Sequence, residues 1–460
     1  MTLIVLCLVT ILFFIAKHTI HDRLSKTVMY LFLLWWGIWL IISTLNVYQL
    51  FTVPMTIYLL LILGLFVFLI GYLTAYNKKR DQRHTSLIAH HLVIDKNLLL
   101  NIILTLVFLI ISFYFVRYLR LRSVLPTDEL RMIRFSVGAL FTTTRRLLFF
   151  NFFIEGFVFF LYPVIAYLLM TKKYATYTFV LSVLSVLFYA SIGSGRLPIV
   201  YLMISVILAF FMSQWRDEKD SIETPNYHKK VVKASLFSLI FIIPALIIYA
   251  AYITSVRLGF SGLSIEGLIV GANELIKQFI IYFTGPFRAL NYGIENYAPE
   301  IGPLYGQATI AALNELLHAT FHLLGAEIRN INYLIGDYLQ NRAILVGDNV
   351  FMNYSFTYLM IFYFDFGVFG VILFSFMFGF FSRKVIFLFD DTKSLPSFIL
   401  LNLMFLSMII SIFNWLIQSP SVMIAIIATL IWHYSIKQEK IVVINSEKEK
   451  VGSIHEYITH

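Results

Sequence analysis

Long apolar segments recur along the chain and are separated by shorter polar stretches. The segments 51–76 and 98–115 carry no charged residue over a length that matches the thickness of a bilayer. A helix satisfies its own backbone hydrogen bonds, so each such segment is expected to cross the membrane as a helix. The pattern predicts about eleven transmembrane helices, at 3–17, 28–46, 52–75, 98–116, 148–170, 174–193, 197–214, 234–254, 366–384, 397–414 and 420–436.

Two polar segments between these helices, roughly 117–147 and 255–350, are too long to be turns. Residues 307–325 of the second segment show helical periodicity, and we expect this helix to lie on the outer leaflet. Its apolar stripe consists of Ile310, Leu313, Leu317, Phe321 and Leu324. The predicted organisation is 1–254 (helices one to eight, including the loop 117–147), 255–350 (long outer loop), 351–436 (helices nine to eleven) and 437–460 (tail).

Lysine and arginine near the ends of the predicted helices set the orientation. If the helices alternate in direction, the basic clusters all fall on one side, which is then the cytosol. This places the N-terminus outside, the C-terminal tail in the cytosol, and both long loops on the outer face of a cytoplasmic membrane. The clusters are Lys78, Lys79, Arg80, Arg83, Lys172, Lys173, Lys229, Lys230, Lys233, Arg383, Lys384, Lys437 and Lys440.

Composition excludes a soluble protein. Hydrophobic residues make up 60% of the chain and charged residues only 13%, so a soluble fold could not cover the apolar surface. The net charge of +10 does not indicate nucleic-acid binding, because the basic residues lie between apolar segments and form no single stripe.

Nearly all lysines fall on the predicted cytosolic side, whereas most arginines fall outside. The planar guanidinium group binds phosphate and carboxylate through two hydrogen bonds, which indicates anion recognition at the outer face. Binding of lipid headgroups and pairing with neighbouring acids are the simpler alternatives. The candidate arginines in the loops are Arg131, Arg134, Arg145, Arg146, Arg257 and Arg288.

Glu315, His318 and His322 cluster on another sector of the predicted outer helix, within about 60° of one another. Any of the three is a candidate general base. The two histidines also have the i, i+4 spacing of metal ligands, but the sequence offers no obvious third ligand, and solvated histidines are the simplest interpretation.

Two glycine-containing motifs lie at the ends of predicted helices. The first is Gly193-Ser194-Gly195-Arg196-Leu197-Pro198, where the glycines allow close approach of a ligand and Arg196 sits near the outer membrane surface. Arg196 either binds an anion or extends to lipid headgroups. The second runs from Thr357 to Asp365-Phe366-Gly367, followed by Gly370 and Gly379. Asp365 is interpreted either as the N-cap of the next helix or as a catalytic carboxylate.

With these features the chain resembles the Wzy-type O-antigen or oligosaccharide repeat-unit polymerases. The resemblance rests on the many membrane helices, the glycine-rich turn at Arg196, the long outer loop before the last three helices, and Thr357…Asp365-Phe366-Gly367…Gly370. The family's Asn-x-x-Thr is one residue longer here, since Asn353 precedes Thr357 by four positions. The resemblance implies an all-α fold similar to that of the GT-C glycosyltransferases and O-antigen ligases.

The resemblance also implies a function. A hydroxyl of one polyprenyl-diphosphate-linked oligosaccharide would attack the anomeric carbon of a growing chain and expel polyprenyl diphosphate. Arginines would neutralise the diphosphate, so no metal or other cofactor is expected. The implied partners are the lipid-linked sugar, the bilayer and a chain-length regulator. The diphosphate ligands would be Arg196, Arg257 and Arg288, with Arg131, Arg134, Arg145 and Arg146 as further candidates, and the base would be Glu315, His318, His322 or Asp365.

Two other classes of protein remain open. A flippase for the same lipid-linked sugar would show internal repeats and charges deep in its helices, and the sequence shows no repeat and few such charges. An O-antigen ligase or a sugar acyltransferase would use similar helices and arginines. The sequence contains no Walker A motif and no dinucleotide fingerprint, which argues against ATP-driven or redox chemistry.

Overall fold

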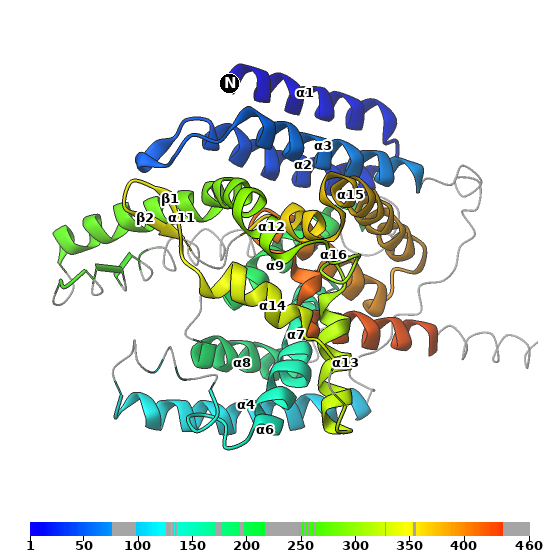
Figure 1. Ribbon diagram of the computed structural model, residues 1–460. Coiled ribbons are helices and arrows are strands. Elements are labelled where there is room, and N and C mark those ends of the chain that lie inside the picture. The colour runs from blue at the N-terminus through cyan, green and yellow to red at the C-terminus, as the bar shows by residue number, and fades with distance from the viewer. Residues whose placement is uncertain are drawn as a thin grey trace, which may run out of the picture.

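The computed structural model describes residues 1–75, 98–125, 130, 133, 136–171, 176–193, 197–216, 248, 251–252, 254–255, 258–260, 264–326, 328–352 and 356–435. Within these residues the chain is predominantly helical (Figure 1). The long helices are α1 (Thr2–Thr19), α2 (Arg23–Ser43), α3 (Met55–Thr74), α4 (Leu98–Arg122), α7 (Glu155–Thr171), α8 (Thr176–Gly193), α9 (Leu197–Arg216), α11 (Ile265–Tyr292), α13 (Ala311–Leu323), α15 (Tyr358–Thr392) and α16 (Leu395–Ile410).

The described helices have the character that the apolar pattern predicts. Seven are long and apolar enough to cross a membrane, and three shorter apolar helices accompany them, the last of which is Pro420–Ser435. They coincide with the predicted membrane segments, except that 234–254 lies largely outside the described residues. Large apolar side chains such as Phe113 and Phe369 are more than half exposed, and a bilayer would cover them. The structure is therefore that of a mainly α-helical membrane protein.

Helices α3 and α15 approach each other closely because glycines lie at their contact. A Cβ atom on Gly71 would lie 2.0 Å from the carbonyl oxygen of Phe376, and one on Gly379 would lie 2.0 Å from that of Phe68. Neither position has room for a side chain. Such glycine contacts are a common way for membrane helices to pack.

The segment between residues 264 and 352 contains a long helix, α11, which the sequence analysis did not predict. Its C-terminal part, from Phe283 to Leu290, is buried, whereas Ile265, Ile269 and Phe279 nearer its start are exposed. Short elements follow: η5 (Gly293–Tyr297), α12 (Ala298–Ile301), α13, α14 (Ile331–Gly336), η6 (Asp337–Asn341) and the antiparallel strands β1 (Ile344–Gly347) and β2 (Val350–Met352).

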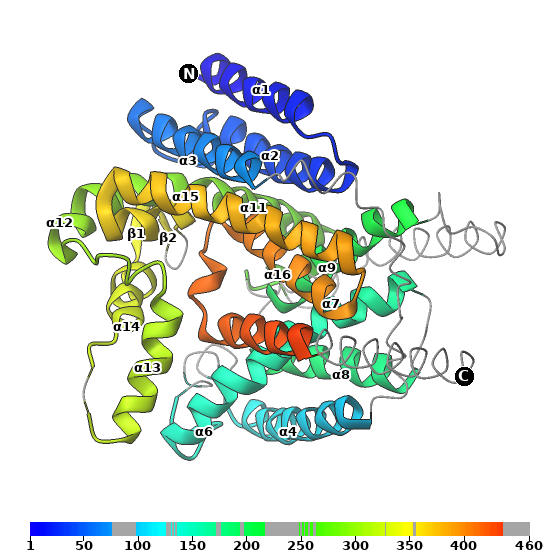
Figure 2. The same cartoon turned by 90° about the vertical axis from the view of Figure 1, so that its right-hand side faces the viewer.

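The β-hairpin joins this segment to the turn that follows α2. The Phe51 amide donates to the carbonyl of Val346 at 3.0 Å, and the Asp348 amide donates to that of Gln49 at 2.9 Å. Figure 2 shows the hairpin, α12, α13 and α14 together at one end of the helix bundle. By the predicted orientation this is the outer end.

Helix α13 is the amphipathic helix predicted at 307–325, although it begins only at Ala311. It runs across the direction of α4 and α8 (Figure 2). Its predicted apolar stripe points away from the protein, since Ile310, Leu317 and Leu324 are 49%, 45% and 76% exposed. A helix lying in a membrane surface would bury this stripe in lipid.

Helix α15 begins eight residues earlier than predicted, so the N-cap interpretation of Asp365 is wrong. The residue before its first turn is Thr357, and the helix bends at Phe366 and Gly367, where Gly367 has a φ of 61°. The bend exposes backbone carbonyls to another segment. The carbonyl oxygens of Phe364 and Asp365 accept hydrogen bonds from the amides of Leu304 and Tyr305, at 2.9 and 3.2 Å.

Candidate functional site

A polar cluster lies where the segment 264–352 meets the helix bundle. The Asn332 side-chain amide on α14 donates to the Glu315 carboxylate on α13. Gln418 lies in the short 3-10 helix η7 (Leu416–Gln418), and its side-chain amide donates to the Asn332 side-chain oxygen at 2.8 Å. Two consecutive helices and a turn that is 86 residues further along the chain therefore meet in one series of side-chain hydrogen bonds that ends at Glu315.

Glu155 belongs to the same cluster but comes from the bundle. It is the first residue of α7 and directly follows the π-helical turn η4 (Phe150–Ile154), a distortion often found at functional sites. Its carboxyl group is hydrogen-bonded to the Tyr189 hydroxyl of α8 and lies close enough to Glu315 for like charges to repel. Glu155 therefore lies on the bundle side of the cluster, within electrostatic range of Glu315.

The packing of Gly156 supports this placement independently. A Cβ atom there would lie 2.9 Å from the carbonyl oxygen of Ser421, so α7 touches the backbone that follows Gln418. Glycine at this position allows α7 to pack closely on the segment that follows Gln418.

Aromatic hydroxyls form the wall of the cluster on the bundle side. Tyr162 of α7 and Tyr201 of α9 have ring centroids 5.9 Å apart, and neither ring is more than 7% exposed. Tyr189 is 8% exposed. Glu155 itself is half-buried.

Burial raises the pKa of Glu315 above its usual value. The Asn332 hydrogen bond and the nearby His318 act in the opposite direction and offset part of this effect. A raised pKa means that the carboxylate binds a proton more strongly than a solvated one does. Glu315 is therefore a better proton acceptor than an ordinary surface glutamate.

The two histidines of α13 differ in their surroundings. His318 Nδ1 lies 2.6 Å from the carbonyl oxygen of Ile328. A carbonyl can only accept, so Nδ1 carries a proton and donates this hydrogen bond. His322 is exposed and stacks on His318, with ring centroids 5.9 Å apart. In the described part of the chain, no group of three or more His, Cys, Asp or Glu side chains is placed to hold a metal ion.

Asp365 does not lie in this cluster. Its buried carboxylate accepts hydrogen bonds from the amides of Ala308 and Thr309, at 2.8 and 2.9 Å, and from the Thr309 hydroxyl at 2.6 Å. Trp415 Nε1, just before η7, donates to the Thr309 carbonyl at 3.1 Å. Asp365 therefore fastens the turn before α13 to α15 and η7, and so positions α13.

Arg288 is 5% exposed and directs its guanidinium at the protein itself. It donates to the carbonyls of Phe51, Thr284 and Ser43, at 2.6, 2.9 and 3.1 Å, and to the side-chain oxygen of Asn46 at 3.0 Å. These hydrogen bonds stabilise the turn after α2, and they occupy the guanidinium with acceptors of the protein itself. We therefore do not include Arg288 in the proposed site.

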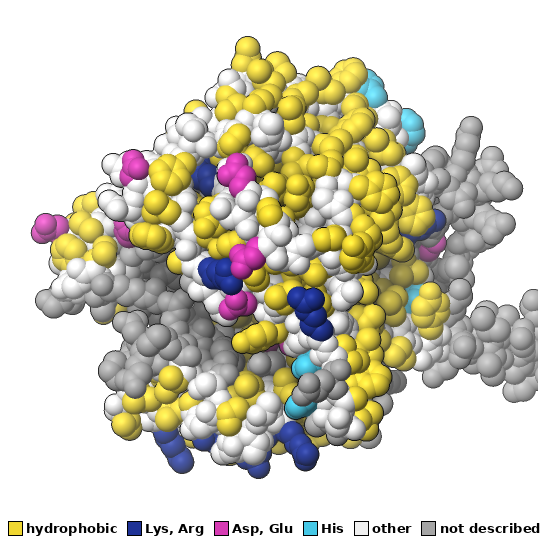
Figure 3. Space-filling view, in the orientation of Figure 1, with side chains coloured by type: hydrophobic (Ala, Val, Ile, Leu, Met, Phe, Trp, Pro, Cys, Tyr) yellow, Lys and Arg dark blue, Asp and Glu magenta, His cyan; other side chains and the backbone are white. Residues whose placement is uncertain are grey.

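The remaining predicted arginines fall into two groups. Arg145 and Arg146 are exposed on α6 (Thr144–Phe149), and with Arg120 and Arg122 of α4 they form an exposed arginine patch, where basic side chains appear over α4 and α6 in Figure 3. Arg146 also donates to the Thr142 hydroxyl at 2.9 Å. The others lie outside the described residues: Arg131, Arg134, Arg196 and Arg257.

Sequence analysis missed Glu155, although a signal was present. It is the only charged residue in the apolar segment 148–170, and a charge inside such a segment is costly and usually functional. Tyr189 and Tyr201 flank the turn at Arg196 in the sequence, but tyrosine is common in this chain and carried no signal by itself.

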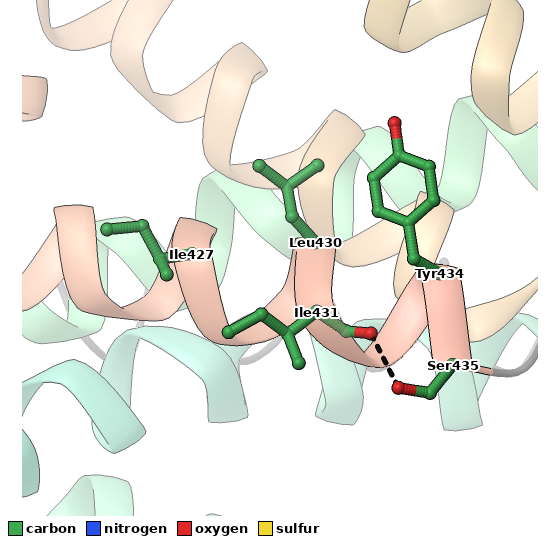
Figure 4. A pocket seen from close by; sticks show the side chains of 5 residues that line it. All are labelled: Ile427, Leu430, Ile431, Tyr434 and Ser435. Atoms are coloured by element: carbon green, nitrogen blue, oxygen red, sulfur yellow. Dashed lines mark hydrogen bonds between the residues drawn. The ribbon is translucent and has the colours of Figure 1, made fainter.

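A separate groove of about 360 Å³ lies on the helix Pro420–Ser435, toward the end away from Gln418 (Figure 4). Its described lining carries no charged group, and the Ser435 hydroxyl donates to the Ile431 carbonyl at 2.9 Å. The lining consists of Ile427, Leu430, Ile431, Tyr434 and Ser435. An apolar surface of this kind fits a lipid chain better than a reacting sugar.

Comparisons of the chain with protein-family models, with curated proteins and with solved structures found no match.

Proposed function

We propose that this chain is a membrane glycosyltransferase that joins polyprenyl-diphosphate-linked oligosaccharide repeat units on the outer face of the cytoplasmic membrane. The proposal starts from the resemblance of the Arg196 and Asp365 motifs to those of the repeat-unit polymerases. The observation that carries it is the polar cluster around Glu315, where a carboxylate with a raised pKa is reachable at one end of an apolar bundle.

The cluster is well placed for a substrate that is half lipid and half sugar. Helix α13 carries Glu315 on one face and an exposed apolar stripe on another, so it would hold the carboxylate at the membrane surface. A polyprenyl chain dissolves in the bilayer, and its diphosphate and first sugars lie at that same level. The reacting carbon would therefore lie at the height of the carboxylate.

The proposed reaction is a single displacement. A hydroxyl of one repeat unit gives its proton to a carboxylate of the cluster, and its oxygen bonds to the anomeric carbon of the other chain. The bond from that carbon to the diphosphate breaks, and polyprenyl diphosphate leaves with the electron pair. Cationic groups lower the cost of the developing negative charge, and the candidates are Arg196 in the sequence and the exposed Arg145 and Arg146.

The test is the size distribution of surface polysaccharide on a gel, in cells that lack the gene and carry complementing variants. In the deletion strain, we expect lipid carriers with a single repeat unit and no ladder of longer chains on the gel. Strains with Glu315→Gln or Arg196→Ala at normal protein level should show the same pattern. Glu266→Gln, which alters an exposed carboxylate at the start of α11, should restore the ladder. An unchanged ladder in the deletion strain would contradict the proposal.

The same cells separate the competing functions. Single-unit carriers held on the cytosolic face would indicate a flippase. Full-length polymer that accumulates on its lipid carrier, without transfer to a final acceptor, would indicate a ligase.

A further inference from the structure

We propose that Asn332 and Gln418 are positioning residues for Glu315, and that their hydrogen bonds hold its carboxylate in the ionised form that a general base requires. The inference rests on the proposed function and adds two residues to its site. Both would act through Glu315 and would not touch the reacting atoms.

Each hydrogen bond in this series has a defined direction. An ionised carboxylate can only accept, so the Asn332 side chain presents its NH2 group to Glu315. The oxygen of the same amide faces Gln418, whose side-chain NH2 group donates to it at 2.8 Å. A protonated Glu315 that donated its proton to Asn332 would need both amides in the opposite orientation. The orientation of the two amides therefore favours the ionised carboxylate.

Asn332 is held beside this carboxylate by contacts between α13 and α14. The side-chain oxygen of Asn314, the residue before the carboxylate, accepts from the Ile331 amide at 2.8 Å. The Asn330 side chain caps α14 by accepting from the Tyr333 amide at 2.9 Å. Hydrogen bonds on both sides of Asn332 thus fix the backbone from which its amide extends.

Gln418 is held in place by the fold of η7. The residue is only 9% exposed, and its backbone amide donates to the Trp415 carbonyl at 3.0 Å. Trp415 Nε1 donates to the Thr309 carbonyl at 3.1 Å, so η7 is also tied to the turn before α13. Gln418 therefore donates to Asn332 from a fixed position.

The hydrogen bond from Asn332 opposes the effect of burial on the base. Burial raises the pKa of Glu315, whereas Asn332 and the nearby His318 lower it. Glu155 of α7 lies within electrostatic range. In the described helices α14 and η7, which pack on α13, the one titratable side chain is Tyr333, which is 74% exposed. Loss of the Asn332 hydrogen bond should therefore raise the pKa of Glu315 further and leave less of the base ionised at neutral pH.

Infrared spectra measure the protonation of Glu315 without any assay of turnover. Protonated carboxyl groups give a carbonyl band, and the difference between each protein in liposomes and its Glu315→Gln counterpart isolates the contribution of Glu315. The decline of this band with rising pH gives the midpoint at which Glu315 is half ionised. We expect the midpoint to rise by about one pH unit in Asn332→Leu, which removes the donor, and by about half a unit in Gln418→Met, which frees the donor to turn.

A double variant separates action through Asn332 from a direct effect. When Asn332→Leu is already present, Gln418→Met should cause no further shift, because Gln418 acts only through Asn332. Gln278→Met is the matched control. The Gln278 amide also donates to a glutamate, Glu274, at 3.2 Å, and its loss should leave the midpoint of Glu315 unchanged.

An unchanged midpoint in Asn332→Leu would overturn the proposal, and an unchanged midpoint in Gln418→Met would remove Gln418 from it. Equal shifts by Gln418→Met with and without Asn332 would also contradict action through Asn332. If Gln418→Met does not fold, Gln418→Glu takes its place in the same comparison. Its ionised side chain can only accept, so the midpoint should again rise. None of these results depends on polymer synthesis.

Polymer synthesis by the reconstituted protein then tests the consequence for the base. A general base acts only when it is ionised, so the rising limb of the pH profile should move to higher pH by the same amount as the midpoint. A purely structural role would lower the rate at every pH and leave the limb in place. If the wild type polymerises and the limb does not move, the two residues do not position the base. If the wild type does not polymerise, the proposed function fails, and the infrared midpoints alone test the positioning.

Discussion

Charged residues at the junctions between elements differ in what their polar atoms contact. Arg288 and Asp365 direct their polar atoms at backbone and side-chain groups of the protein and hold its turns in place. The carboxyl groups of Glu155 and Glu315 are half-buried, and within the described residues they are hydrogen-bonded to Tyr189 and Asn332, respectively. A carboxyl group with free acceptor capacity can exchange a proton, whereas one that accepts three hydrogen bonds cannot do so without breaking them.

Replacement of Arg288 tests its structural role. Arg288→Gln would remove the donors to the carbonyls of Phe51 and Ser43, the second of which is buried, and we expect it to reduce the free energy of unfolding by about 3 kcal/mol. Thermal unfolding of the purified protein in detergent measures this. The exposed Arg145→Gln is the control and should unfold at the wild-type temperature. Unchanged stability of Arg288→Gln would return Arg288 to the candidates for substrate binding.

Asp365 is expected to behave in the same way. In Asp365→Asn an amide replaces one of the oxygens that accept from Ala308 and Thr309, so we expect a loss of about 2–3 kcal/mol in unfolding free energy. Asp390→Asn, at an exposed site on the same helix, should have little effect. If Asp365→Asn abolished polymer synthesis but kept full stability, Asp365 would be a catalytic carboxylate after all.

The sequence singled out Glu315 as a candidate because helical periodicity alone defines the face on which it lies. It could not show that the Arg288 guanidinium already donates hydrogen bonds within the protein. The acceptors lie at the end of α2 and in the turn after it, and they meet Arg288 only in the folded chain. Asp365 was misplaced for a related reason. The apolar residues before it extend the helix back to Tyr358, and the bend at Gly367 is not visible in a hydropathy profile.

At the scale of helices, the apolar pattern was most informative for elements that lipid surrounds. It gave little information on α11, whose charged residues Glu266, Glu274 and Lys277 suggested a loop. The motif glycine Gly379 turned out to serve the contact between α3 and α15. That contact depends on two helices far apart in sequence, so a single sequence does not reveal it.

This contact gives a prediction for glycine substitutions. Gly379→Ala would place a methyl group on the carbonyl oxygen of Phe68, and we expect a loss of about 1–3 kcal/mol in unfolding free energy as the helices separate. Gly193→Ala at the end of α8 meets nothing within 4 Å and serves as the control. Thermal unfolding of the two purified variants in detergent measures this loss. Equal melting temperatures would mean that α3 and α15 are not tightly packed.

For the whole molecule, the proposed function depends on the orientation in the membrane, and the positive-inside pattern predicts that α13 and α6 face outward. Cysteine labelling tests this in a chain whose exposed Cys7 is replaced by serine. We expect Thr142→Cys to react with a membrane-impermeant maleimide in intact cells. Lys393→Cys, in the turn between α15 and α16, should react only after permeabilisation. The reverse pattern would place the polar cluster in the cytosol, where flipped substrate is absent.

The central claim is that this protein by itself links lipid-bound repeat units, and reconstitution tests it most directly. The purified protein would be placed in liposomes with the single-unit carriers extracted from the deletion strain, and the products would be followed by gel and mass spectrometry. We predict a ladder of lengthening chains, with one polyprenyl diphosphate released for each new linkage, and no ladder with Glu315→Gln. Carriers that keep a single unit in the presence of the folded wild-type protein would contradict the account.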